Sequence, residues 1–485
     1  MLADMPTLNL PNFKIMNLIL TGTTLAPQIT PDIRHLDDGY TKRPLNLRCL
    51  DICVHMMDLL KADTQPMDDF FAPQLVSPDS DKQLRELMYQ LFAFLKPIDQ
   101  YRWTDIRDRS KPKSAQSSQT GNLRNGISLT NINTDDDKHD EQLLTNIHFN
   151  RLSTNFWDFL KWALNCASLQ HQKPYFVSWR IWKNLIRLFV DFYWYDMESQ
   201  NYIGNQQSDI QAIRSTYIYN AVLFLSGESI VTGFREVSKI LFTSNKVSGP
   251  IFENELRVLK TAAIPEEIGA PKYDSIPLKS TIMNLLYNMA KRLDPDPDRY
   301  TSQLILEYGE KLIQLPTREL VELFSNACIQ EEEMLLLLSL NLLEQIASNV
   351  DYGEPYSWFF KSPSIDESFL NFIVSEGPDI IERKSHKRLR QHIDHLELMN
   401  TLINFQLALW MRHNFESLSL DEKTATKDKI LYSLKKMDEN RQKSIEVTYK
   451  ECKLQNILLE EDDKLYLEGK LFLPKLHDIY WIKFT

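Results

Sequence analysis

The sequence predicts an all-α protein, built as an irregular HEAT-like helical solenoid or as a helical bundle. Three observations lead to this fold class. Apolar residues recur at helical spacing through most of the chain. Only 13 of the 485 residues are glycine, whereas tight β-turns and phosphate-binding loops both need glycine. The 22 prolines lie mostly between the periodic segments, where helices end. No repeat with a fixed period of roughly 34 to 47 residues is present, which argues against a regular TPR or armadillo array.

Residues 155–197 predict two helices that meet at Pro174 and hold five of the nine tryptophans. These are Trp157, Trp162, Trp179, Trp182 and Trp194. The first helix is apolar on one face and the second on two, and a helix of the second kind is normally buried between other helices. We therefore expect a central helical hairpin enclosed by its neighbours. An aromatic binding pocket is the functional alternative, but aromatics at helical spacing usually form core.

Composition limits the classes of function. The net charge of −11 argues against a protein that binds nucleic acid over its whole surface, although a local basic patch is compatible with it. Five mostly separated cysteines are typical of a reducing compartment. The first residues do not have the pattern of a secretory signal, and no apolar run is long enough for a membrane span. We expect a nuclear protein, with a cytoplasmic one as the alternative.

Proline clusters, composition shifts and helical periods divide the chain into six expected segments. They are an extended N-terminal arm (1–40), an N-terminal helical segment (41–107), a disordered insertion (108–142), a central helical core (143–277), a C-terminal helical array (278–420) and a long exposed helix with a tail (421–485). The insertion is rich in Ser, Asn and Asp, and such a composition buries too little apolar surface to offset the entropy of ordering.

Outside the hairpin, apolar periodicity predicts further helices. They cover residues 45–62, 80–95, 210–225, 230–242, 280–293, 300–315, 317–328, 331–349, 366–374, 385–415 and 420–461. Residues 226–229 form a predicted turn, and the prolines and glycines of 246–277 predict a boundary between helical layers.

No cofactor and no metal is expected. Cys49 and Cys53 lie one helical turn apart, but no second Cys/His pair has zinc spacing, and we expect His55 on another face. His392 and His395 lack the HExxH pattern and have basic neighbours. Nucleophile elbows, P-loops, dinucleotide fingerprints and kinase signatures are absent from the sequence. An enzyme is therefore not the expected class.

Two short stretches are candidate contact sites. The densest basic run consists of Arg383, Lys384, Lys387, Arg388 and Arg390. It is either an ordinary solvated start of a helix or a contact for phosphate or an acidic partner. The second stretch is apolar and consists of Tyr480, Trp481 and Ile482. This end of the tail either docks back on the body or contacts a partner.

The hairpin also carries a resemblance. The strings FWDFLKWALNCASLQ (156–170) and SWRIWKNLIRLFVDF (178–192) resemble the middle of the fifth non-SMC element of the budding-yeast Smc five-six genome-maintenance complex. The helix order of 280–375 agrees loosely, whereas the N-terminal arm and the tail do not match. The resemblance implies a helical, non-catalytic subunit that pairs with another non-SMC element and regulates an SMC ATPase on DNA, with ties to SUMO ligation. No catalytic residue is implied.

From these observations we expect a non-catalytic helical scaffold or regulatory subunit of a nuclear multiprotein complex. By the resemblance, this is an SMC-type complex that acts in DNA repair and chromosome organisation. The expected partners are other protein subunits, including a second helical non-SMC subunit and SMC proteins, with at most a local DNA contact. Neither a membrane nor a small-molecule substrate is expected. The alternatives are a cytosolic helical adaptor or assembly chaperone, and a helical enzyme.

Overall fold

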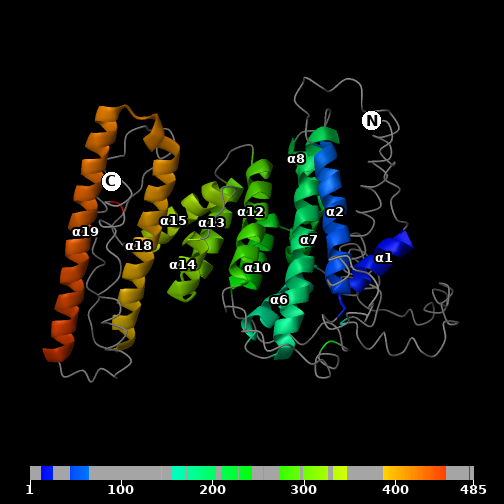
Figure 1. Ribbon diagram of the computed structural model, residues 1–485, viewed down its shortest axis with the longest axis horizontal. Helices are drawn as coiled ribbons and strands as arrows, with labels where there is room; N and C mark the ends of the chain where they lie inside the picture. Colours follow the sequence, from blue (N-terminus) through cyan, green and yellow to red (C-terminus); the bar gives the residue numbers. More distant parts are fainter. Residues whose placement is uncertain are drawn as a thin grey trace, which may run out of the picture. The chain divides into compact units, whose positions relative to one another are not determined.

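The computed structural model (Figure 1) describes residues 13–25, 44–64, 144, 156–170, 173–203, 209–227, 229–242, 255, 274–294, 299–325, 331–346, 386–454 and 480. Within these residues the regular secondary structure is helical and there is no β-strand, so the predicted all-α class is confirmed. The chain forms two compact units, 1–301 and 302–485. The predicted helix 80–95, the insertion 108–142 and the predicted helix 366–374 lie outside the described residues.

Among the described residues, eight helices lie wholly in the first unit. They are α1 (Phe13–Gly22), α2 (Leu45–Thr64), α6 (Phe156–Ser168), α7 (Lys173–Ile203), α8 (Asp209–Ser215), α9 (Tyr217–Ser226), α10 (Ile230–Phe242) and α12 (Ile276–Leu293). The helix α13 (Arg299–Leu312) begins at the end of this unit and continues into the second. The remaining elements are α14 (Thr317–Ser325), α15 (Glu332–Ile346), α18 (His386–Asn414), the 3₁₀ turn η4 (Phe415–Ser417) and α19 (Leu420–Leu454).

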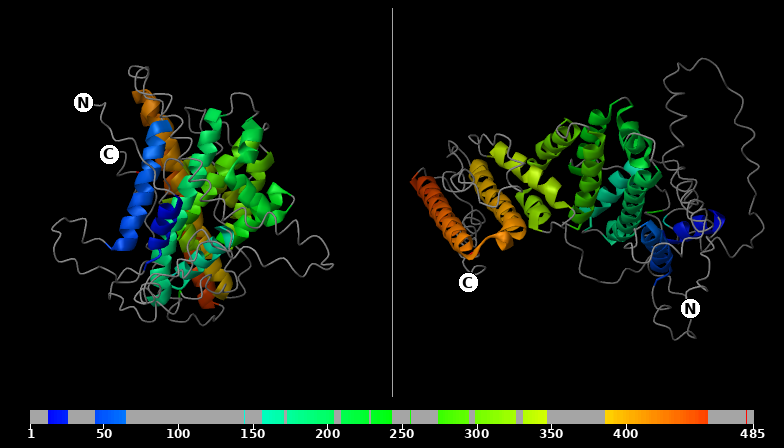
Figure 2. Two further views of the ribbon diagram at one scale, coloured as in Figure 1. Left: turned by 90° about the vertical axis from the view of Figure 1, so that its right-hand side faces the viewer. Right: turned by 90° about the horizontal axis from the view of Figure 1, so that it is seen from above.

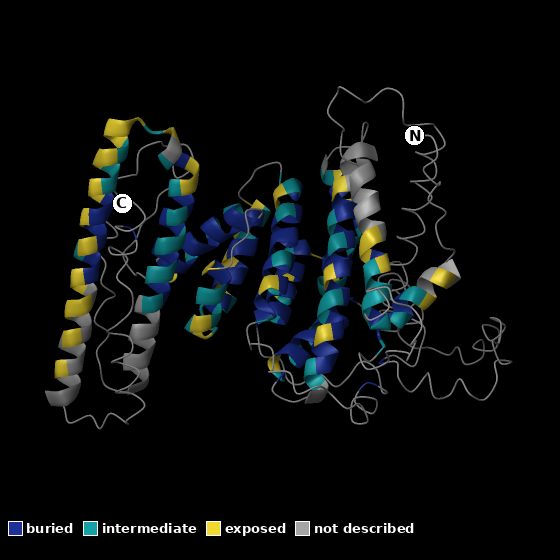
Figure 3. Ribbon diagram, viewed as in Figure 1, coloured by how far each residue is buried: buried dark blue, intermediate teal, exposed yellow. Residues whose placement is uncertain are grey.

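The hairpin of α6 and α7 is the core of the first unit. Both α2 and α12 pack on α7, and α10 packs on α6 (Figure 1). Nine of the 13 residues of α6 and most of the middle of α7 are buried (Figure 3). Trp157, Trp162, Trp179 and Trp182 are at most 1% exposed. The prediction of an enclosed hairpin is therefore confirmed.

Edge-to-face aromatic pairs join the two helices of the hairpin. Phe156 meets Tyr193 with ring centroids 5.2 Å apart, and Phe159 meets Trp182 at 4.9 Å. This geometry sets the positive edge of one ring against the negative face of the other, and each such pair contributes about 0.5 to 1.5 kcal/mol beyond burial. The spacing of aromatics along each helix thus fixes how α6 lies on α7.

A single helix predicted over 210–225 is wrong, because Thr216 divides it into α8 and α9. Thr216 has an extended backbone (φ −67°, ψ 152°), and its hydroxyl accepts a hydrogen bond from the Tyr219 N–H at 3.3 Å. The Asp196 carboxylate on α7 accepts the Tyr217 N–H at 2.6 Å. These acceptors cap the start of α9. The helix ends as predicted in a turn at Gly227, whose φ of 75° favours glycine.

Two further predictions, one about the N-terminal arm and one about the start of α12, need correction. The extended arm predicted over 1–40 contains α1, whose Leu20 is buried. The sequence predicts that Pro277 ends the segment before the helix, yet Pro277 lies in the first turn of α12, which begins at Ile276. Proline fits there because its missing N–H would have no helical partner in that turn.

In the second unit, α14 and α15 pack on α18, and α18 and α19 form an antiparallel hairpin joined through η4 (Figures 1 and 2). Phe324 of α14 meets Phe405 of α18 with ring centroids 5.4 Å apart. The buried Gln406 on α18 donates to the Ser339 hydroxyl on α15 at 2.9 Å. Apolar and polar contacts therefore both hold α18 in place. The helices predicted over 300–315, 317–328, 331–349, 385–415 and 420–461 are confirmed to within a few residues in the described part of the chain, and the ends 326–328, 347–349 and 455–461 lie outside it.

Gly233 permits the close crossing of α10 on α9, and this generates a prediction. A Cβ at this position would lie 2.6 Å from the Val222 backbone oxygen. We expect Gly233→Ala to lower the free energy of unfolding by about 1 to 3 kcal/mol, since backbone cannot yield as a flexible side chain can. Chemical denaturation of the full chain measures the change. Thr232→Ala, at the exposed neighbouring position, is the control and should change little. Equal stability of Gly233→Ala and the wild type would contradict this account.

Candidate functional site

A buried carboxyl group, Glu255, lies against the tryptophan hairpin. It is 0% exposed and belongs to the connection between α10 and α12. Its Oε2 accepts the indole N–H of Trp162 on α6 at 2.7 Å, and its Oε1 accepts that of Trp182 on α7 at 2.7 Å. The fully buried Ser178 hydroxyl also interacts with the carboxyl group. One side chain from a distant part of the chain therefore joins both helices of the hairpin.

The surroundings of Glu255 favour its neutral form. Burial raises the pKa of the Glu255 carboxyl, and the neighbouring polar groups of Ser178, Trp182 and Trp162 lower it only in part. The neighbouring Cys166 is fully buried. Burial, followed by the nearby Glu255, raises the pKa of the Cys166 thiol far above its ordinary value. A thiol in such a place is not an activated nucleophile, because nucleophilic attack requires the thiolate. Glu255 and Cys166 therefore have the properties of structural groups that link α6 to α7.

Two more tryptophans of the hairpin have acceptors. The indole N–H of Trp179 donates to the Asp274 carboxylate at 2.8 Å, and Lys183 on the same face of α7 forms an ion pair with that carboxylate. The indole N–H of Trp157 donates to the backbone oxygen of Ala221 on α9 at 2.7 Å. Sequence reasoning missed both acidic acceptors. Glu255 and Asp274 lie in stretches with little helical periodicity, so no local pattern marks either residue as an acceptor.

The predicted basic run lies at the beginning of α18. Lys387, Arg388 and Arg390 are in its first two turns, where the backbone is described and the side chains are not. Arg383 and Lys384 lie outside the described residues. The N-terminal end of a helix has a partial positive charge from the peptide dipoles, which adds to the attraction of basic residues for anions. This position is compatible with a solvated start of a helix and with a contact for phosphate or an acidic partner.

At the end of the tail, Tyr480 is fully buried in the second unit. Its hydroxyl is within hydrogen-bond distance of two Asn404 oxygens on α18, the backbone oxygen at 3.2 Å and Oδ1 at 3.1 Å. Burial raises the pKa of the Tyr480 hydroxyl well above its ordinary value. Of the two expectations for this stretch, docking on the body therefore holds for Tyr480. Trp481 and Ile482 lie outside the described residues.

The cysteines of α2 are packing residues. Cys53 is buried, and this burial raises the pKa of its thiol to about 12. Cys49 lies against Gly22 of α1, where a Cβ would come within 2.8 Å of its sulfur. His55 is exposed. Among the residues that the structure describes, no group of three or more His, Cys, Asp or Glu could hold a metal ion. No described helix is both long and apolar enough to cross a membrane.

A second buried carboxylate, Glu332, joins α15 to α18. Its side chain is 7% exposed, forms an ion pair with Arg412, and lies 3.0 Å from the Nε2 atom of His413, which is charged only when protonated. Glu332 lies in the first turn of α15, and its two partners lie in the last turn of α18. The charges of Glu332 and Arg412 thus each have the sign that their own helix terminus favours. The arrangement stabilises the crossing of the two helices.

No family model matches the chain, and a search of curated proteins gives no match either.

Glu255 generates a prediction about pH. Its raised pKa means that the folded protein binds a proton more tightly than the unfolded chain does. Between the ordinary carboxyl pKa and the raised value, stability contributed by this group falls as pH rises. Glu255→Gln has no such titration. We therefore expect the free energy of unfolding of the wild type, relative to Glu255→Gln, to decrease as pH is raised through this window.

Urea denaturation of both proteins at a series of pH values measures this difference. The amide that replaces the carboxyl group accepts from only one indole, but that deficit is independent of pH and leaves the slope interpretable. Trp179→Phe serves as a control that removes an indole N–H elsewhere in the hairpin, and it should keep the slope of the wild type. If the free energy of unfolding of the wild type and that of Glu255→Gln differed by a constant amount across the window, the pKa of the Glu255 carboxyl would not be raised by folding.

Tyr480 generates a second prediction about stability. Tyr480→Ala should lower the free energy of unfolding by about 3 to 5 kcal/mol, because it removes a fully buried aromatic side chain. Tyr480→Phe removes only the hydroxyl and should lower it by about 0.5 to 1.5 kcal/mol. Tyr432→Ala is the matched control, since Tyr432 is 62% exposed on α19, and it should change the stability by less than about 0.5 kcal/mol. Similar losses for both alanine variants would exclude the docking of Tyr480.

Proposed function

We propose that the chain is a non-catalytic helical scaffold or regulatory subunit of a nuclear multiprotein complex. The observation that carries this proposal is that the polar groups at the hairpin bond to one another and hold helices together. The acidic groups beside the hairpin, Glu255 and Asp274, accept hydrogen bonds from tryptophans of α6 and α7. The Cys166 thiol beside Glu255 is buried, and its pKa is raised. These groups hold helices together, as expected for a rigid platform.

The resemblance of residues 156–192 to the fifth non-SMC element supports a more specific proposal. The chain would then act in an SMC-type complex in DNA repair and chromosome organisation, beside a second helical non-SMC subunit and SMC proteins. The strings that carry the resemblance are those of the α6–α7 hairpin, so the resemblance concerns the part of the first unit on which the neighbouring helices pack. The all-α fold is compatible with such a subunit.

Native co-purification tests the proposal. The tagged full chain is isolated from its source after nuclease treatment, so that proteins bridged only by DNA are lost, and its partners are quantified by mass spectrometry. SMC and non-SMC subunits in stoichiometric amounts would support the proposal. Stoichiometric cytosolic proteins, with no chromosomal subunit, would favour the alternative of a cytosolic adaptor or assembly chaperone.

The basic run generates the prediction of this section. Replacing Lys387, Arg388 and Arg390 together with Glu should weaken binding to DNA or to an acidic partner at least about tenfold, because three attractive charges become repulsive. Fluorescence anisotropy with a short labelled DNA duplex, and co-purification of the variant, are the measurements. Circular dichroism should show an unchanged helix content.

A matched variant controls for the change in net charge. Arg187, Arg214 and Arg299 are exposed and are distributed over three helices within residues 1–301. Their joint replacement with Glu changes the net charge equally without touching α18. Equal losses of binding in both variants would mean that only net charge matters. Unchanged binding in the first variant would reduce the run to a solvated start of a helix.

A further inference from the structure

Four lysines follow one another along α19 at intervals of seven residues. They are Lys429, Lys436, Lys443 and Lys450. Seven residues are nearly two helical turns, so each lysine lies about 10.5 Å further along the axis than the last. The drift around the helix is only about 20° at each step. The four therefore share one face, and Tyr432 lies on it between the first two.

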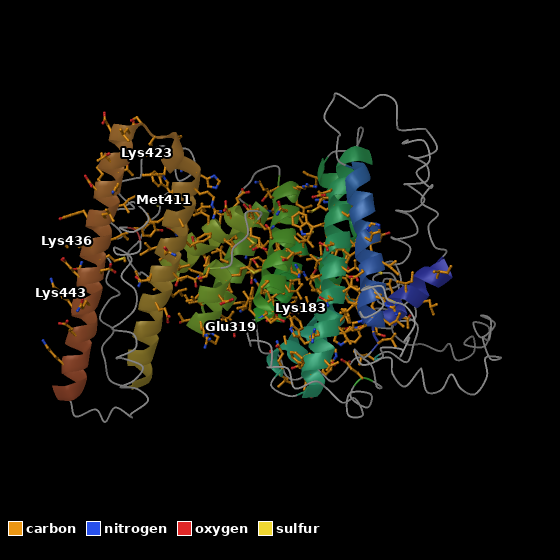
Figure 4. All side chains as sticks on the ribbon, in the orientation of Figure 1. Lys183, Glu319, Met411, Lys423, Lys436 and Lys443 are labelled. Atoms are coloured by element: carbon orange, nitrogen blue, oxygen red, sulfur yellow. The ribbon has the colours of Figure 1, made fainter. Side chains whose placement is uncertain are left out.

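This face of α19 is its more exposed side: Lys429, Tyr432, Lys443 and Lys450 are exposed, and Lys436 is half-buried. The opposite side is buried and consists of Ile430, Leu431, Leu434 and Met437. Figure 3 shows the exposed residues of α19 on the side away from α18. Lys436 and Lys443 extend from that side (Figure 4). We call the face formed by the four lysines and Tyr432 the lysine stripe.

Tyr432 is unusual for a solvated helix face. It is 62% exposed, and the Lys436 ammonium lies 5.9 Å from the centre of its ring. A cation at this distance from an aromatic face is attracted by the ring and keeps the two side chains together. Tyrosine on a surface supplies a large contact area with few rotatable bonds, and it is enriched among the residues that dominate binding energy. The stripe thus combines regular charge with an aromatic anchor.

We propose that the lysine stripe is a docking surface for an acidic helix of a partner protein, one that carries Asp or Glu at intervals of seven residues. Two helices that lie along each other present the same axial rise per residue. A seven-residue spacing of carboxylates therefore matches the lysines over the whole length of the stripe, as flanking charges do in coiled coils. Tyr432 packs its ring against the aliphatic part of the partner helix.

Two other occupants fit the stripe less well. Glu439 and Glu446 are exposed and lie beside the lysines on α19, so a continuous row of phosphates would meet repulsion as well as attraction. An acidic helix that also carries Lys or Arg beside its carboxylates can pair with these two residues. A second copy of α19 offers no more than two carboxylates in succession at this spacing, as at Glu439 and Glu446, so half of the four lysines would stay unmatched. Charge complementarity therefore favours a partner helix over DNA and over self-association.

This inference rests on the proposed scaffold function and names the chemistry of one partner. It can fail while that function stands, because native co-purification tests assembly without reference to α19. The direct test uses the full chain and two synthetic alanine-rich helical peptides of equal length and composition. The first peptide carries Glu at every seventh position, and the second carries the same number of Glu residues at every fifth position.

Fluorescence anisotropy measures binding of each labelled peptide at low and at physiological salt. We expect the seven-residue peptide to bind at least about tenfold more tightly than the other, since only its carboxylates face all the lysines. Replacing Lys436, Lys443 and Lys450 together with Glu should remove this binding. Tyr432→Ala should weaken it several-fold with the helix content unchanged. The variant with Arg187, Arg214 and Arg299 replaced by Glu carries the same change of net charge and should bind as the wild type does.

Each other outcome overturns the proposal. Equal binding of both peptides would show unspecific attraction of acidic chains. Binding of a short DNA duplex that is lost in the triple lysine variant, with no preference between the peptides, would identify a nucleic-acid surface. A dimer of the wild type that the triple lysine variant loses would identify self-association. No binding of the seven-residue peptide at low salt would leave the stripe a solvated face.

Discussion

Every tryptophan buried in a helical core brings an indole N–H that needs an acceptor, and this requirement organises the first unit. A buried donor left without a partner costs about 1 to 3 kcal/mol. The backbone oxygens of α6 and α7 are largely used within those helices, so acceptors must come from elsewhere in the chain. The structure supplies the Ala221 backbone oxygen on α9 and two carboxyl groups from the connection that precedes α12. The aromatic core and that connection therefore depend on each other.

The two carboxyl groups meet the same demand by different physical means. Asp274 is partly exposed and has Lys183 beside it, so its charge is balanced by a cation while it accepts from Trp179. Glu255 is fully buried, and the hydrogen bonds it accepts do not offset the loss of solvent, so its pKa rises. A carboxyl group that tends toward neutrality costs less to bury than a charged one. Glu255 can therefore lie between two helices where an ion pair would be expensive.

Periodicity predicted the helices well because it reports which residues each helix buries. The ends of α10 at Ile230 and Phe242 follow directly from the apolar pattern. The break at Thr216 could not be predicted in this way, because part of its stabilisation comes from Asp196 on another helix. Glu255 was equally inaccessible to sequence reasoning. Its two donors are 93 and 73 residues away in the chain, and nothing near it in the sequence marks an acidic residue as buried.

The two tyrosines of the second unit show how the same side chain acquires opposite roles. Tyr480 is buried with its hydroxyl against Asn404 of α18, whereas Tyr432 lies exposed on α19 with a lysine over its ring. The sequence pattern near the chain end singled out Tyr480 as a contact residue, because it stands in an apolar stretch. Apolar neighbours, however, favour burial within the protein itself. Tyr432 has regularly spaced charges around it instead and stays exposed. In a helical scaffold, an exposed aromatic residue of this kind indicates a surface for a partner better than the apolar stretch around Tyr480 does.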